Sequence, residues 1–160
     1  MPRMSKKEID EFLSRPLFAK IGTLLEDGSP YVCPIWFLWE ENIVLLEGRK
    51  GFGGVPAKWV ENLERDPRIA ILFSTEDDPY TRVLITGTAE IQDPPPSDWQ
   101  ETDMRRAIKY LGEEGAKRYK STLPPIPGAR IKVKPKKILT WRGTDWHRRY
   151  LHPKAERENS

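Results

Sequence analysis

The sequence predicts a mainly β fold, an antiparallel barrel with peripheral helices. Its first half contains five short segments rich in apolar and β-branched residues, each bounded by turn residues or by one short helix. These expected strands span residues 19–25, 31–39, 43–47, 68–74 and 81–91. Short strands in succession, with a single helix inserted among them, are typical of a β-barrel.

The N-terminal part is expected to form a helix followed by a hairpin. Ser5 and Glu8 make a capping-box pattern before an apolar stripe, which predicts a helix over Ser5–Ser14. Asp27-Gly28 predicts a tight turn between the first two strands. Because Pro34 lacks the N–H of a ladder bond, we expect it at a sheet edge, a bulge or a ligand-facing stretch.

The second half is expected to add a long helix over residues 97–119 and the strands that close the sheet. Ser97 and Gln100 repeat the capping-box pattern, and Gly112 is a candidate break within the helix. Three apolar side chains of this helix are expected to face inward: Trp99, Ile108 and Leu111. The expected closing strands, separated by Pro135, are 130–134 and 137–141.

Size and charge indicate one globular domain without a nucleic-acid partner. A chain of 160 residues is long enough to bury roughly two-thirds of its unfolded surface in a single core. We expect one domain over residues 1–150 and a polar tail over 151–160. The 27 Lys and Arg against 24 Asp and Glu leave a charge of +3, which is too small and too evenly mixed to indicate nucleic-acid binding.

The cysteine content and the absence of long apolar runs predict a cytoplasmic protein. Cys33 is the only cysteine, which excludes an intramolecular disulfide and a cysteine-based zinc cluster and suits a reducing compartment. The sequence contains neither an apolar run of about 18 residues nor a signal-peptide pattern at its start. We therefore expect no membrane partner, and we expect no metal site.

The segment after the third expected strand is a candidate phosphate site. Gly48–Gly54 has four glycines in seven positions and carries Arg49 and Lys50, and Lys58 opens the helix that follows. Glycine lets backbone N–H groups approach an anion closely, while a helix N-terminus and cations attract it. The alternative interpretation is a solvated basic loop.

The same segment carries the most specific resemblance to a known family. After the basic loop come Lys58, Asn62-Leu63 and Asp66-Pro67-Arg68, then the next strand. This order resembles the pyridoxamine 5'-phosphate oxidase-like FMN-binding split-barrel superfamily, in its flavin and deazaflavin oxidoreductase branch. The resemblance implies a six-stranded antiparallel split barrel and a homodimer whose cofactor grooves lie between the subunits. It also implies that Lys58 contacts the cofactor phosphate, with Arg49 and Lys50 assisting.

By the same resemblance, two further segments are expected beside the cofactor ring. The second expected strand contributes four residues that line the ring. The last expected strand ends in an aromatic and a basic residue, which lie beside the ring in related proteins. The full set of expected cofactor-binding residues is Val32, Pro34, Ile35, Trp36, Gly48, Arg49, Lys50, Lys58, Trp141 and Arg142. For Ile35 and Phe37 ordinary barrel core is an equal alternative, and Cys33 is expected to be a buried small apolar residue rather than a nucleophile.

These expectations lead to an oxidoreductase that uses FMN or the deazaflavin coenzyme F420 on a small organic substrate. Both cofactors carry a phosphate on a ribityl chain, so the basic loop does not choose between them. Because the cofactor performs the redox step, no side chain is assigned as catalytic. The alternative is a non-enzymatic protein that binds or sequesters flavin or haem, for which His147 and His152 are the available histidines.

Overall fold

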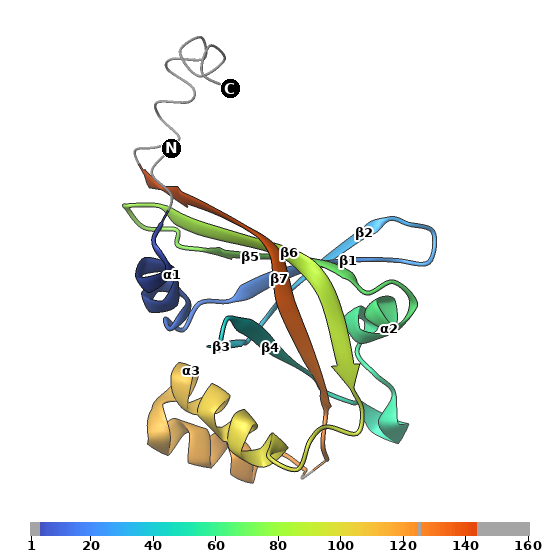
Figure 1. Ribbon diagram of the computed structural model, residues 1–160. Coiled ribbons are helices and arrows are strands. Elements are labelled where there is room, and N and C mark those ends of the chain that lie inside the picture. Colours follow the sequence, from blue (N-terminus) through green and yellow to red (C-terminus); the bar gives the residue numbers. More distant parts are fainter. Residues whose placement is uncertain (1–3, 125, 144–160) are drawn as a thin grey trace, which may run out of the picture.

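The strands form one antiparallel sheet that curls on itself, as the computed structural model shows for residues 4–124 and 126–143 (Figure 1). The strands are β1 Ala19–Leu24, β2 Pro30–Ile35, β3 Leu38–Glu40, β4 Ile43–Gly48, β5 Arg68–Ser74, β6 Thr81–Gln92 and β7 Ala129–Arg142. The helices are α1 Lys6–Leu13, α2 Lys58–Arg65 and α3 Trp99–Ser121, with a short 3-10 turn, η1, at Phe52–Gly54.

The curl follows from how the two edge strands are connected. The strand order is β2-β1-β5-β6-β7-β4-β3, so β2 and β3 lie at opposite edges of the sheet. Only Trp36 and Phe37 separate these two strands along the chain. The edges must therefore approach each other, which gives a barrel that remains split between β2 and β3. The expected split barrel is confirmed.

The core fills the concave face of this sheet. Ile21 of β1, Ile71 of β5 and Ile85 of β6 stand side by side in register and are fully buried. Phe37, at the split, packs against Phe73 with ring centroids 4.4 Å apart. Burial of apolar side chains is the main stabilising term of such a barrel.

The sheet has seven strands where six were expected. The segment 31–39, expected as one strand, is divided into β2 and β3 because the chain crosses from one edge of the sheet to the other at Trp36 and Phe37. Conversely, the two expected closing strands form one continuous strand, β7. Pro135 is accommodated there at a register shift opposite Gly87, where a bulge removes the need for a ladder N–H.

The helix ends match the expected pattern at α1 and depart from it at α3. Ser5 caps α1, its hydroxyl accepting from the N–H of Glu8 while the Glu8 carboxylate accepts from the N–H of Ser5. The residue that caps α3 is Asp98, so the capping box of Ser97 and Gln100 does not form. The expected break at Gly112 is confirmed, with φ 71° and ψ 173°.

The inward face of α3 is polar, which overturns one expectation. Ile108 and Leu111 are 37% and 40% exposed, although both were expected to face inward. The buried positions of the helix are Thr102, Asp103, Arg106, Ala107 and Ala116. The helix turns these side chains to the barrel because β4 and β7 present charged partners to it, as the ion pairs below show. Within the described residues, no helix is long and apolar enough to cross a membrane.

Candidate functional site

A cavity of about 320 Å³ lies where the split, the N-terminus of α2 and helix α3 meet. We call it the β2–α2 cavity. Its lining combines aromatic rings with charged groups: Phe18, Pro34, Ile35, Trp36, Glu47, Arg49, Ala57, Trp59, Arg106 and Tyr119. Ligand pockets commonly enclose about 300–1,000 Å³, so this space is large enough for a small organic ligand.

One wall of the β2–α2 cavity comes from an edge strand. Pro34 and Ile35 belong to β2, which pairs only with β1 among the described strands, so the expected place of Pro34 at a sheet edge is confirmed. An edge strand presents backbone N–H and C=O groups that its own sheet leaves unpaired. This wall therefore offers hydrogen-bonding groups beside an apolar surface.

Trp36 continues this wall, and α3 holds its ring in place. The Tyr110 ring stacks on Trp36 with centroids 4.7 Å apart and planes 6° apart. Tyr119 contacts the same indole in a tilted arrangement, with centroids 5.5 Å apart. Because such aromatic pairs favour fixed geometries, Trp36 is an ordered wall of the cavity.

Helix α3 also satisfies backbone groups that the split leaves without ladder partners. The N–H of Phe37 donates to the Tyr110 hydroxyl at 3.2 Å, and that hydroxyl donates to the Leu17 carbonyl at 2.5 Å. The Lys109 ammonium donates to the carbonyls of Leu13 and Phe37, at 3.0 and 3.2 Å. Burial raises the pKa of Tyr110 to about 12 and lowers the pKa of Lys109 to about 8.

The opposite wall is formed by the end of β4 and the start of α2. Gly48 ends β4 directly beneath α2, where a Cβ atom would collide with Val60. Ala57 occupies the N-cap of α2 without a side-chain hydrogen bond, and the amides of Lys58 and Trp59 have no partner among the described residues. Free N–H groups at a helix N-terminus attract anions. Arg49, whose side chain is 44% exposed, follows Gly48 at the same end of the cavity.

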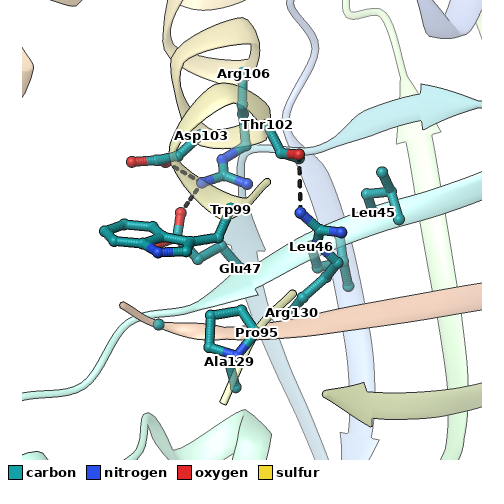
Figure 2. A pocket seen from close by; sticks show the side chains of 11 residues that line it. Leu45, Leu46, Glu47, Pro95, Trp99, Thr102, Asp103, Arg106, Ala129 and Arg130 are labelled. Atoms are coloured by element: carbon teal, nitrogen blue, oxygen red, sulfur yellow. Dashed lines mark hydrogen bonds and ion pairs between the residues drawn. The ribbon is translucent and has the colours of Figure 1, made fainter. Parts of the chain in front are cut away.

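A buried ion cluster lies behind this wall, and Figure 2 shows Arg106 reaching from α3 between Asp103 and Glu47. Arg106 forms ion pairs with both carboxylates, and Asp103 also pairs with Lys120. An Arg49 nitrogen lies 3.8 Å from the same Asp103 carboxylate. We call Glu47, Arg49, Asp103, Arg106 and Lys120 the α3 ion cluster.

The Arg106 guanidinium keeps its charge at neutral pH. Burial lowers the pKa of Arg106, but only to about 10, so the guanidinium stays protonated. A buried charge without a partner would cost several kcal/mol, which explains why carboxylates accompany it. The pocket drawn in Figure 2 encloses only about 20 Å³, enough for roughly one water molecule. The β2–α2 cavity is much larger than this pocket and joins aromatic rings to Arg49 and a helix N-terminus, so it is the candidate ligand site.

The structure brings four of the expected cofactor-binding residues together in the β2–α2 cavity: Pro34, Ile35, Trp36 and Arg49. Lys58 lies beside this group in the first turn of α2, and its ammonium is 3.4 Å from Glu61. Lys50 instead pairs with Asp93 at 2.7 Å. Gly48 supports α2, as described above, without lining the cavity.

The remaining expected residues lie on the convex face of the sheet or at its far end. Val32 is 67% exposed on the face of β2 opposite to the core. Trp141 pairs with Arg82 across β6 and β7, and the Arg82 guanidinium lies 5.9 Å from its ring centroid. Arg142 pairs with Glu8 of α1 at 2.9 Å. His147 and His152 lie outside the described residues, as does the expected tail 151–160.

Sequence reasoning missed the contribution of α3. Asp103, Arg106 and Tyr110 occupy one face of that helix, and Tyr119 and Lys120 follow after the break at Gly112. The spacing of 103, 106 and 110 was the available signal, because residues three and four apart share a helix face. A helix face that carries charged residues is usually predicted to face solvent.

Cys33 does not join the site. It stands opposite Ile21 on the core face, and burial raises the pKa of its thiol. A raised pKa disfavours the thiolate, the reactive form, at neutral pH. Among the described residues, no group of three or more His, Cys, Asp or Glu side chains is placed to hold a metal ion.

Comparison with known proteins gives a match over nearly the whole described chain. The family model described as pyridoxamine 5'-phosphate oxidase matches residues 5–142. A comparison with curated proteins finds no match.

Solved structures share the fold at low sequence identity. A conserved hypothetical protein, Rv2991 from Mycobacterium tuberculosis, is 22% identical with a TM-score of 0.67, covering 90% of this chain and 88% of its own. An F420 reductase is 22% identical with a TM-score of 0.59, covering 81% and 94%. An FAD-binding protein from Mesorhizobium loti is 16% identical with a TM-score of 0.58, covering 86% and 94%.

Proposed function

Because this chain belongs to the pyridoxamine 5'-phosphate oxidase family, we propose that it is an oxidoreductase that binds a phosphorylated flavin or deazaflavin in the β2–α2 cavity. The observation that carries the proposal is the pairing of two features at one cavity. An aromatic wall and a basic group, Arg49 with the uncapped N-terminus of α2, line the same space.

The basic part of the lining fits the cofactor phosphate. Arg49 can donate two parallel hydrogen bonds to phosphate oxygens. The free amides of Lys58 and Trp59 lie at the N-terminus of α2, which is the positive end of the helix dipole and also attracts a phosphate. Lys58 assists from the first turn of the helix, because its exposed pairing with Glu61 is weak and easily exchanged. Lys50 contributes less, since Asp93 already neutralises it.

The aromatic part of the lining fits the planar ring system. Trp36 and Tyr119 supply apolar surface, while the edge of β2 near Pro34 and Ile35 offers backbone groups to the polar edge of the ring. A bound flavin or deazaflavin supplies the two-electron transfer itself. The protein then binds the phosphate, orients the ring and excludes water through α3, and no side chain of the cavity needs to transfer a proton.

The convex face of the sheet supports assembly as a homodimer. The register places a group of apolar outward positions on four neighbouring strands: Gly22, Leu24, Ala70, Leu72, Leu84 and Leu139. Charged outward positions such as Lys20, Arg68 and Arg82 flank this group. A shallow apolar depression of about 490 Å³ lies on this face beside Pro30. Apolar patches of this kind commonly mark protein interfaces. In a dimer formed through this face, the outward-facing Val32 and Trp141 would lie on the side of the partner subunit.

Titration with matched ligands tests the proposed function. We expect FMN or F420 to bind more tightly than riboflavin, which lacks the phosphate. Replacing Arg49 by Met should weaken FMN binding by at least about 10-fold, because each of the two hydrogen bonds that it removes is worth about 10- to 150-fold in affinity. Riboflavin binding should change by less than about 3-fold, because it makes no such bond.

The control for this test is Arg118→Met, which removes an exposed arginine that lines no cavity described above. It should leave both affinities unchanged. Equal losses of FMN and riboflavin affinity in Arg49→Met would contradict the phosphate site. A tightly bound flavin that no electron donor reduces, or a Soret band from bound haem, would favour sequestration over redox chemistry.

A further inference from the structure

A second cavity adjoins the first on the far side of Arg49. It encloses about 210 Å³, and we call it the α3 cavity. Its lining is Glu47, Arg49, Trp99, Gln100, Asp103, Met104, Lys120, Leu123, Pro124 and Ile126. Glu47 and Arg49 also line the β2–α2 cavity, so the two spaces meet at these side chains.

The break in α3 creates this second space. In a straight helix, with a rise of about 1.5 Å per residue, Asp103 and Lys120 would lie about 25 Å apart. Instead they form an ion pair, and the Lys120 ammonium lies 5.8 Å from the ring centroid of Trp99. The part of α3 after Gly112 is thus folded back on the first part, and the α3 cavity lies between them and the segment that follows.

Arg49 stands at the junction of the two cavities. Its guanidinium lies 5.4 Å from the ring centroid of Tyr119, which lines the β2–α2 cavity. On its other side it lies 3.8 Å from Asp103, which lines the α3 cavity. A phosphate bound by Arg49 would therefore have the ring cavity on one side and the α3 cavity on the other.

The position of Arg49 distinguishes cofactors that end at the phosphate from cofactors that continue beyond it. A phosphomonoester such as FMN would end at Arg49 and leave the α3 cavity without an occupant, whereas a longer cofactor has a neighbouring space for its remaining part.

We propose that the α3 cavity receives the part of a longer cofactor that lies beyond the ribityl phosphate, such as the adenylate of FAD or the acidic tail of F420. This inference rests on the proposed function, because it requires the phosphate at Arg49. The apolar side chains of Trp99, Met104 and Leu123 would pack on that group, and Lys120 would face any anion that it carries.

The test compares FMN, FAD, F420 and riboflavin in titrations of the full-length protein. At least one of FAD and F420 should bind at least 10-fold more tightly than FMN. Met104→Trp, which fills the α3 cavity, should abolish that preference while changing FMN affinity by less than 3-fold. Gln100→Trp fills the cavity from an exposed position and provides a second variant if Met104→Trp fails to fold. Leu111→Trp, on the exposed side of α3, is the matched control and should change nothing.

The outcomes separate this inference from the proposed function. A preference for FAD identifies an adenylate, and a preference for F420 identifies an acidic tail. If FMN binds as tightly as both FAD and F420, or if the cavity-filling variants weaken all three cofactors equally, the inference is wrong and the proposed function stands. If none of the three cofactors binds more tightly than riboflavin, both are wrong.

Discussion

Removing one hydroxyl from α3 should loosen the closure of the split barrel. In Tyr110→Phe the ring can still stack on Trp36, but the hydroxyl that accepts from Phe37 and donates to Leu17 is lost. Each of these hydrogen bonds contributes a net of about 0.5–1.5 kcal/mol. We therefore expect the free energy of unfolding to fall by about 2 kcal/mol, which lowers Tm by about 4–8 °C for a chain of this size.

Tyr119→Phe is a matched control for this prediction. Tyr119 contacts the same indole from the same helix, and its hydroxyl has no hydrogen-bond partner among the described residues. Its loss should change the free energy of unfolding by less than about 0.5 kcal/mol. Urea denaturation followed by tryptophan fluorescence and by circular dichroism measures both variants. Equal stability of the two variants would show that α3 does not close the split through the Tyr110 hydroxyl.

Two further predictions concern Lys109 and the convex face. The pKa of Lys109 lies at about 8, below its ordinary value of 10.5, so between pH 8 and 10 the unfolded chain binds more protons at this site than the folded one. The stability of the natural protein relative to Lys109→Met should therefore rise as the pH increases from 8 to 10, and a pH-independent difference in denaturation midpoints would contradict this. Leu84→Glu, on the convex face, should convert a dimer into a species of 18.6 kDa by sedimentation equilibrium, whereas Ile108→Glu on α3 should not. A natural protein that is already monomeric would refute the dimer.

The strands were predictable because their patterns are local. In β1 and β6 alternate residues such as Ile21, Val83 and Ile85 face the core, and a period of two is visible in the sequence. The division between β2 and β3 was not predictable in this way. Pro34-Ile-Trp-Phe-Leu-Trp39 is one apolar run, and it is interrupted only because the sheet curls and the chain crosses the gap between its edges.

The continuity of β7 and the polar face of α3 depend on distant partners. Pro135 ordinarily ends a strand, and here it is accommodated because Gly87 on the neighbouring strand lets the backbones approach. The pattern of Asp103 and Arg106 in the sequence is typical of a helix face exposed to solvent. Both residues are nevertheless buried, because Glu47 pairs with Arg106 and Lys120 pairs with Asp103. The basic loop predicted Arg49 as a site residue, but only the folded chain places it between two cavities.

The most direct test of the cofactor site is a crystal structure of the full-length protein with its tightest-binding flavin or deazaflavin. We predict phosphate oxygens within hydrogen-bond distance of the Arg49 guanidinium and of the Lys58 or Trp59 amide, with the ring system beside Pro34 and Trp36. A phosphate bound elsewhere, with the β2–α2 cavity empty, would contradict the account.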